Sequence, residues 1–225
     1  MDWTAIALSL KLSAATTAVL LALGLPLAHW LAFSRHRFKF LIEAVVALPL
    51  VLPPTVLGLY VLVALGPRSP LGGLVHALTG TILPFSFQGL LLASVLYSLP
   101  FAVQPMAAAF AGVERGLVEA AWSLGASRTR AFLRIILPLS LPGVVTGAVL
   151  AFAHTLGEFG VVLMVGGNVP GVTRTASIAI YDEVQALDYR AAGQTALLLL
   201  AISFAVLAVT YGLQRRVWSP WQTRS

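Results

Sequence analysis

The sequence is short of charged residues and contains no cysteine. Only 10% of its 225 residues are Asp, Glu, Lys or Arg, whereas 59% are apolar. An average soluble domain has roughly 25% charged residues, and so few charges cannot cover a soluble surface of this size. The composition therefore indicates a membrane protein. Without cysteine, disulfides and thiolate metal sites are excluded.

Lysine is also scarce, and this excludes a nucleotide-binding motif. The two lysines are Lys11, which follows Leu10, and Lys39, which follows Phe38. A P-loop needs Gly-x-x-x-x-Gly-Lys-Ser/Thr, in which the lysine reaches the phosphates. We therefore expect no catalytic, cofactor-binding or metal-binding residue in this chain. Any ATP hydrolysis linked to it must come from another polypeptide.

Long uncharged runs predict an all-α membrane protein with five transmembrane helices. A helix needs about 20 apolar residues to cross a bilayer. We expect spans at about 12–34, 44–66, 88–110, 139–165 and 191–214, within a single transmembrane domain that covers residues 1–225. Residues 114–138 form a polar loop between the third and fourth spans. Residues 67–87 and 166–190 form loops at the opposite side.

The distribution of basic residues predicts the orientation. Segments 34–40, 114–134 and 215–225 hold ten of the 14 Lys and Arg residues, and short cytoplasmic loops carry such an excess. The N-terminus is therefore expected outside and the C-terminus inside. Because Asp2 replaces the basic start of a signal peptide, the first segment is expected to be a retained span. The basic residues lie at the ends of apolar runs and not on one face, so no nucleic-acid partner is expected.

The longest polar interruption, Glu119 to Pro138, reads EAAWSLGASRTRAFLRIILP. Gly125 can supply the left-handed position that ends one helix, and Ser127 can cap the next. The final proline is expected to stop the second helix before the fourth span. Ala120 and Ala121 leave a small-residue surface that the groove of another protein can approach. A hairpin without a partner is an alternative; a DNA-binding helix-turn-helix conflicts with the attachment of both ends to membrane spans.

A proline-rich stretch, LPLVLPPTVLG, interrupts the second apolar run at residues 48–58. Three prolines within six residues cannot all occupy a regular helix, because each removes a backbone donor and clashes with the preceding turn. Broken backbone at membrane depth is tolerated where it is buried in protein or lines a water-filled cavity. A packing kink and a pathway lining therefore remain alternative interpretations.

A second irregular stretch, TLGEFG at 155–160, places the ionisable Glu158 inside the fourth span. Such a residue marks a functional site by default. His154 lies four residues earlier on the same helical face, so the pair forms either a proton relay or an i,i+4 hydrogen bond. The neighbouring glycines favour the structural interpretation, since glycines allow close packing. Together the pathway or gate candidates are Pro49, Pro53, Pro54, Thr55, Gly157, Glu158, Phe159 and Gly160.

The outer segment from Gly166 to Tyr189 begins with the turn residues GGNVPG. A short amphipathic stretch follows. Three interpretations stay open for this segment: a generic outer loop, a docking surface for an extracytoplasmic binding protein, and an anion contact through Arg174. The docking candidates are Asn168, Thr173, Arg174 and Thr175.

The polar loop has the spacing of the EAA loop by which the membrane subunit of bacterial ABC importers docks on its ATPase. The matching residues are Glu119, Ala120, Ala121, Gly125, Ile135, Leu137 and Pro138. With this loop, LPLVLPPTVLGL (48–59), ILPLSLPGVVTGAVLAFAHTLGEFG (136–160) and GGNVPGVTRTASIAIY (166–181) resemble molybdate ABC transporter permeases over about residues 10–214.

The EAA loop alone identifies the importer class, whereas GEFG followed by N-x-P-G-x-T-x-T points to importers of molybdate, tungstate or sulfate. Sulfate permeases tend to have Tyr where Phe159 stands, which favours molybdate. Two residues depart from the family pattern: His154 stands where arginine is common, and Val172 where a polar residue is common.

The resemblance implies a type I importer fold that works as a homodimer among the lipids of the bacterial cytoplasmic membrane. A cytoplasmic ABC ATPase dimer would bind the EAA loops, and an extracytoplasmic oxyanion-binding protein would deliver molybdate or tungstate. A sulfate-type permease is an alternative. A proton-coupled secondary transporter that uses His154 and Glu158 is an alternative of a different class. Since the predicted spans hold no Lys or Arg well inside the bilayer, we expect the pathway to bind a dianion weakly.

Overall fold

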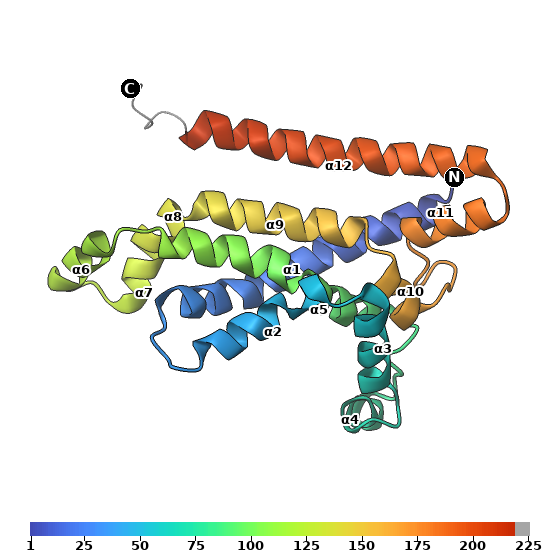
Figure 1. Ribbon diagram of the computed structural model, residues 1–225, viewed down its shortest axis with the longest axis horizontal. Helices are drawn as coiled ribbons and strands as arrows, with labels where there is room; N and C mark the ends of the chain where they lie inside the picture. The colour runs from blue at the N-terminus through green and yellow to red at the C-terminus, as the bar shows by residue number, and fades with distance from the viewer. Residues whose placement is uncertain (219–225) are drawn as a thin grey trace.

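The computed structural model describes residues 1–218, with side chains described as far as Gly212 (Figure 1). Within these residues all regular structure is helical. The long helices α1 (Trp3–Phe33), α5 (Phe87–Ala111), α9 (Leu141–Leu156) and α12 (Tyr189–Trp218) run along the long axis of the molecule. The basic side chains of the C-terminal segment 215–225, which we predict to be cytoplasmic, lie outside the described part.

Shorter helices connect and cover these four. They are α2 (Lys39–Val51), α3 (Pro54–Leu65), α4 (Pro70–Thr79), α6 (Arg115–Ser123), α7 (Arg128–Ala131), the π-helical turn η1 (Phe132–Ile136), α8 (Leu137–Leu139), α10 (Gly160–Gly166) and α11 (Ala176–Gln185). The pair α3 and α4 projects sideways from the bundle, whereas α6 and α7 form one of its ends (Figure 1).

Among the described residues, three helices are long and apolar enough to cross a membrane, or up to five if each of two bent helix pairs is one span. The three are α1, α5 and α12. Helix α1 begins at Trp3, where the Asp2 carboxylate caps it by accepting a hydrogen bond from the Ala5 N–H at 3.0 Å. Lys11, which precedes the predicted span, is therefore part of this helix, and its ammonium lies 4.7 Å from the centre of the Phe87 ring.

The predicted span 44–66 consists of two helices, α2 and α3, bent by 115°. The bend lies at Leu52 and Pro53, which are both extended. Two consecutive prolines explain the bend, because each proline disfavours the helical conformation in the residue before it. Pro49 behaves differently: it lies inside α2 and is buried.

The predicted span 139–165 is not one continuous helix. The chain bends by 72° between Arg128–Leu139 and α9, and α9 ends at Leu156, before α10 starts at Gly160. The second helix of the polar loop stops before the fourth span as predicted, but one residue after Pro138, because the helical stretch continues through Pro138 to Leu139. The π-helical turn directly before Pro138 accompanies this continuation, and the bend falls at Ser140.

Helices α5 and α9 pack closely through two glycines spaced as GxxxG. A methyl group at Gly147 would lie 2.6 Å from the Ala102 carbonyl oxygen, and one at Gly143 would collide with Ala109. Next to them, the Ser140 hydroxyl donates to the Ala109 carbonyl at 3.1 Å. Small residues of this kind let helix backbones approach inside a membrane. We call this contact the α5–α9 seam, and the largest buried apolar cluster surrounds it.

The close approach at Gly147 generates a stability prediction. Gly147→Ala inserts a methyl group against a backbone carbonyl, and overpacking of this kind costs about 1–3 kcal/mol. Gly193→Ala on α12 is the matched control, because no atom lies within 4 Å of its added methyl group. We expect the first variant to unfold at a lower temperature in detergent and the second not to. Equal unfolding temperatures for the Gly147 variant and the unaltered chain would contradict close packing of the two helices at Gly147.

Candidate functional site

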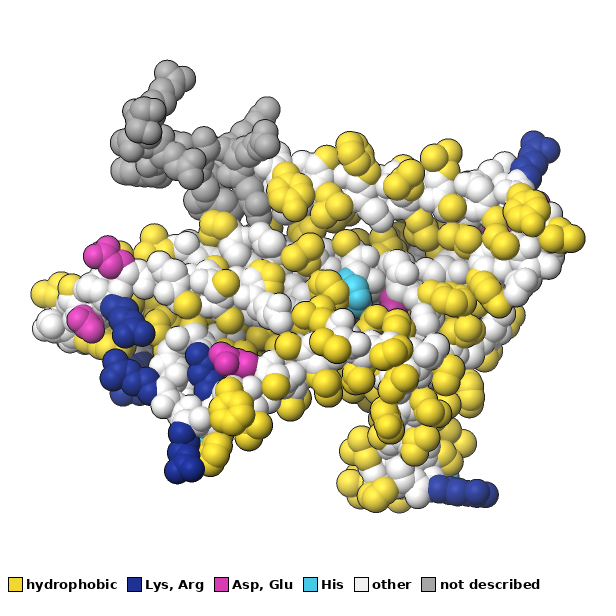
Figure 2. Space-filling model, viewed as in Figure 1, with side chains coloured by type: hydrophobic (Ala, Val, Ile, Leu, Met, Phe, Trp, Pro, Cys, Tyr) yellow, Lys and Arg dark blue, Asp and Glu magenta, His cyan; other side chains and the backbone are white. Residues whose placement is uncertain are grey.

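The polar loop forms a helical hairpin, α6 followed by α7 and η1, at one end of the bundle (Figure 1). On the face that Figure 2 shows, most Lys and Arg side chains gather at this end. The α1–α2 connection with Arg35 and Arg37 lies at the same end, because α1 runs from the opposite end towards it. Two of the segments that the sequence predicts to be cytoplasmic thus lie at the same end of the bundle.

The turn of the hairpin has the geometry expected from its sequence. Gly125 has φ +84°, in the left-handed region. Its N–H donates to the Trp122 carbonyl and the Ala126 N–H donates to the Ala121 carbonyl, both at 2.9 Å. These two hydrogen bonds form a Schellman motif that closes α6. The Ser127 hydroxyl accepts from the Arg130 N–H at 3.2 Å and caps α7. The predicted helix end and cap are both confirmed.

The residues of the motif divide between surface and interior. Glu119, Ala120 and Pro138 are exposed. Ala121 and Leu137 are half-buried and pack against the apolar core, and Ile135 is half-buried too. Part of the motif therefore fixes the hairpin to the bundle, while the other part is free to meet a partner.

One strong surface feature, Leu124, is not among the residues predicted from the sequence. With 89% of its surface exposed, it is the most exposed large apolar side chain in the described part of the chain. It occupies the C-cap of α6, immediately before the left-handed glycine. An apolar residue directly before a helix-ending glycine is the signal that could have indicated it. Leu124 gives the tip of the hairpin an apolar contact point.

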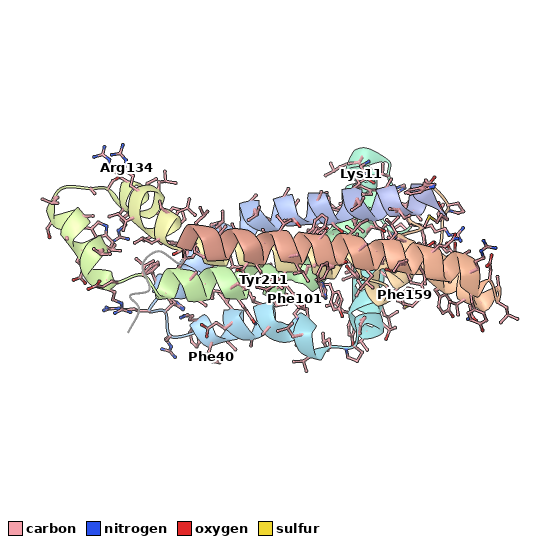
Figure 3. The ribbon with its side chains drawn as sticks, turned by 90° about the horizontal axis from the view of Figure 1, so that it is seen from above. Lys11, Phe40, Phe101, Arg134, Phe159 and Tyr211 are labelled. Atoms are coloured by element: carbon pink, nitrogen blue, oxygen red, sulfur yellow. The ribbon has the colours of Figure 1, made fainter. Side chains whose placement is uncertain are left out.

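The two irregular stretches of the sequence meet in space. A methyl group at Gly160 would lie 2.7 Å from the Cβ of Pro54, and one at Gly58 would lie 2.7 Å from the Cβ of Met164. Helices α3 and α10 are thus in close contact directly after their respective breaks. Pro53, Pro54, Thr55 and Gly157 are exposed, and Gly160 and Phe159 are half-buried. Figure 3 shows the labelled Phe159 on the same flank as Phe101 of α5.

A cluster of polar side chains lies at the end of the α5–α9 seam. The Ser98 hydroxyl hydrogen-bonds to His154 Nδ1 and to the Thr155 hydroxyl, both at 2.9 Å. The imidazole stacks on Phe101 with ring centres 3.9 Å apart, and the centre of the Tyr97 ring lies 4.8 Å from the centre of the imidazole. A single serine of α5 therefore holds one polar atom of each of these two α9 residues.

Glu158 adjoins this cluster but is not hydrogen-bonded to it. Its side chain is buried, with 5% of the residue exposed, and neither carboxylate oxygen has a hydrogen-bond partner among the described residues. Ser94 lies close by, outside hydrogen-bonding geometry. The interpretation of an i,i+4 hydrogen bond between His154 and Glu158 is wrong, because α9 ends at Leu156 and Glu158 has left the helical register.

The docking candidates of the outer segment make contacts within the chain. We call the contacts of Arg174 and Asn168 with Asp182 and Asp2 the clamp. Arg174 pairs with Asp182 at 3.1 Å and with Asp2 at 3.8 Å, and Asn168 donates to Asp182 at 2.7 Å. The Thr173 hydroxyl donates to the Gly166 carbonyl at 2.6 Å and is buried. Thr175 is buried as well. The clamp joins the start of α1 to α11, and of the four candidates only Asn168 is exposed. Their docking role stays a prediction.

Within residues 1–218, no group of three or more His, Asp or Glu side chains is placed to hold a metal ion. The described residues form an exposed hairpin, a tightly packed seam and a pair of helix breaks. Their chemistry rests on hydroxyl groups, one histidine and one buried carboxylate.

Comparison with known proteins identifies relatives over nearly the whole chain. Residues 21–219 match the family model "Binding-protein-dependent transport system inner membrane component". The chain is 50% identical to the Molybdenum transport system permease protein ModB of Azotobacter vinelandii over 214 residues, 95% of each chain. It is 38% identical over 208 residues to the protein of the same name from Escherichia coli K12, which covers 92% of this chain and 90% of the relative.

Solved structures show the same fold at low sequence identity. A bacterial ABC transporter that imports the acidic polysaccharide alginate superposes with a TM-score of 0.78 at 18% identity, covering 96% of this chain and 79% of that chain. The MetNI methionine ABC transporter in an inward-facing conformation superposes with a TM-score of 0.74 at 18% identity, covering 95% and 94%.

The polar cluster generates a second stability prediction. Ser98→Ala leaves His154 Nδ1 and the Thr155 hydroxyl without their shared partner, and an unsatisfied buried polar group costs about 1–3 kcal/mol. The control is Ser123→Ala, which removes an exposed hydrogen bond to the Glu119 carbonyl. We expect thermal unfolding in detergent to shift downward for the Ser98 variant only. Unfolding at the temperature of the unaltered chain would show that this cluster adds nothing to stability.

Proposed function

The chain belongs to the family of binding-protein-dependent transport system inner membrane components, and from this premise we propose that it is the membrane-spanning permease subunit of an ATP-driven molybdate importer. The identity of 50% to a molybdenum transport permease over 95% of both chains carries this assignment. The subunit is not an enzyme: it is the non-catalytic membrane component of an ABC transporter, and ATP is hydrolysed by a separate subunit.

The hairpin α6–α7 is the proposed docking site for an ABC ATPase dimer. It lies at the end of the bundle, its turn is fixed by the Schellman motif at Gly125, and the exposed Leu124 and Ala120 lie beside that turn. A short helix with a small-residue face and one apolar tip suits insertion into a groove. Half-buried Ile135 and Leu137 then transmit the position of the hairpin to the bundle.

The proposed orientation places the hairpin in the cytoplasm and the N-terminus outside. It is supported by the excess of Lys and Arg in the hairpin and in the α1–α2 connection, which share one end of the bundle. In a bacterium this corresponds to the cytoplasmic membrane, with α11 and the clamp at Arg174 on the outer side. An extracytoplasmic oxyanion-binding protein would then meet the exposed turn at Asn168, beside the clamp.

The proposed pathway follows the two helix breaks. Pro53, Pro54, Thr55 and Gly157 are exposed on the single chain, so a pathway lined by them has to be closed by another molecule. A second copy of the chain related by a two-fold axis is the ordinary solution. We therefore place the transport route between two permease subunits, with the breaks of each facing the axis.

In the proposed cycle, ATP binding draws the two ATPase subunits and their attached hairpins together. Each hairpin moves its bundle, and the breaks at Pro53 and Gly157 change from facing the cytoplasm to facing outside. This switch requires ATP and the loaded binding protein to prefer different states of the transporter. Tungstate, which has the same charge and shape as molybdate, is a second proposed substrate.

Transport into vesicles tests this function against the proton-coupled alternative. Vesicles that hold the permease should take up molybdate only with its ATPase, ATP and the loaded binding protein, because this chain has no P-loop. A pH gradient alone should give no uptake, since His154 and Glu158 are not joined by a hydrogen bond. Uptake driven by a pH gradient without the ATPase would overturn the assignment, and preferential uptake of sulfate would point to the sulfate-type permease.

Gly125 provides a test of the hairpin. Its φ of +84° disfavours side chains, although no atom lies within 4 Å of an added methyl group, so conformation and not space is limiting. Left-handed geometry costs a non-glycine residue about 1–2 kcal/mol, and a β-branched one more. We expect Gly125→Val to lower ATP-driven molybdate uptake about tenfold while membrane insertion is unchanged.

Gly125→Asn is the matched control, because asparagine tolerates the left-handed region. It should keep most of the uptake. Full coupled uptake by the valine variant, or equal loss in both variants, would contradict a role for the helix-ending turn.

A further inference from the structure

A cavity of about 430 Å³ lies between the cytoplasmic end of α1 and the hairpin. Arg35 from the α1–α2 connection, Arg115 from α6 and Arg128 from α7 line it, together with Glu119, Phe33 and Trp122. We call this cavity the arginine pocket. It combines a basic rim with apolar walls, and neither docking on the ATPase nor the transport pathway requires that combination.

The charge of the arginine pocket is unbalanced. The titratable and charged residues that line it are three arginines, His29 and a single acidic residue, Glu119. The ion pairs of the described residues involve only Lys39 and Arg174 among the basic side chains. Arg35, Arg115 and Arg128 therefore have no carboxylate partner within 4 Å in the part of the chain that the structure describes. Like charges held around one cavity repel each other, and an anion bound between them relieves this repulsion.

The chemistry of the arginine side chain favours a tetrahedral oxyanion. Guanidinium groups form paired hydrogen bonds with phosphate-like oxygens, and such charge-assisted bonds are stronger than neutral ones. The three arginines come from three separate segments, so an oxyanion bound between them would join the end of α1 to both helices of the hairpin. Arg115, Glu119 and Trp122 follow the i, i+4, i+7 spacing that places them on one face of α6.

The position of the cavity suggests two sources for the oxyanion. Basic pockets between helices on the cytoplasmic side bind the head groups of anionic lipids, and aromatic side chains such as Trp122 favour the membrane interface. A free oxyanion in the cytoplasm, including the transported one, offers the same group.

We propose that the arginine pocket binds one tetrahedral oxyanion, either the head-group phosphate of an anionic lipid or a free oxyanion. The bound oxyanion would hold the hairpin α6–α7 in place against the end of α1. This proposal rests on the cytoplasmic orientation given above. The bound anion would set how firmly the hairpin follows the bundle, and thereby how well ATP hydrolysis is coupled to transport.

Two binding measurements on the purified full-length chain separate the sources. In the first, native mass spectrometry compares retention of phosphatidylglycerol with retention of phosphatidylcholine. In the second, titration calorimetry measures binding of molybdate and of inorganic phosphate. The test variants are Arg115→Gln with Arg128→Gln, and separately Arg35→Gln. The matched control is Arg134→Gln, because Arg134 is an exposed arginine of the same hairpin that does not line the cavity (Figure 3).

We expect one of the two anions to bind, with a loss of about tenfold or more in the test variants and no loss in the control. Retention of phosphatidylglycerol alone assigns the lipid, and binding of molybdate or phosphate assigns the free oxyanion. Binding of neither by the unaltered chain would overturn the proposal, as would an equal loss in the Arg134 control. ATP-driven molybdate uptake by the same preparation shows separately whether the proposed function stands, and the Arg35 variant keeps the test valid if the double variant does not fold.

Discussion

The α5–α9 seam is the contact on which the rest of the structure depends. It begins at Ser140, whose hydroxyl holds the Ala109 carbonyl, continues through the close approach of Gly147 to Ala102, and ends where Ser98 bonds His154 and Thr155. Glycines bring the backbones together, and the serines then satisfy polar groups that hydrocarbon cannot satisfy. Continuous packing between α5 and α9 thus extends from the bend at Ser140, next to the hairpin, to the end of α9 just before Glu158.

This continuity explains how a hairpin at one end can act on a pathway at the other. A packed interface moves as a unit, because interiors are close to crystal density and resist deformation. In the proposed cycle, movement of the hairpin therefore carries α9 together with α5 and transmits the displacement to the breaks. At the breaks, α3 turns away from the long helices, α10 packs on α5 through buried valines, and Gly160 is in close contact with Pro54. In the proposed cycle, the chain bends at the breaks, and the seam transmits the movement of the hairpin to them.

The predictability of each feature follows from how local its cause is. The end of α6 at Gly125, the cap at Ser127 and the bend at Pro53 were predictable because each depends on residues within one turn. The meeting of Pro54 with Gly160, in contrast, depends on contact between segments far apart in the sequence. Pro138 shows the same limit, since a π-helical turn lets the helix continue through it. The sequence pattern therefore indicated which residues are irregular, and the tertiary contacts decide what each irregularity does.

The charge distribution of the breaks bears on selectivity. Glu158 is buried near the Ser94 hydroxyl and has no hydrogen-bond partner among the described residues. Arg174, the candidate for an anion contact in the outer segment, is already paired with two aspartates. In the proposed importer, a dianion that passes the breaks therefore meets no unpaired cation from the clamp. Such surroundings favour release over capture, because unlike-charge attraction is missing at short range. In the proposed importer, selection therefore falls to the binding protein, and the permease supplies a route that holds its substrate weakly enough to let it go.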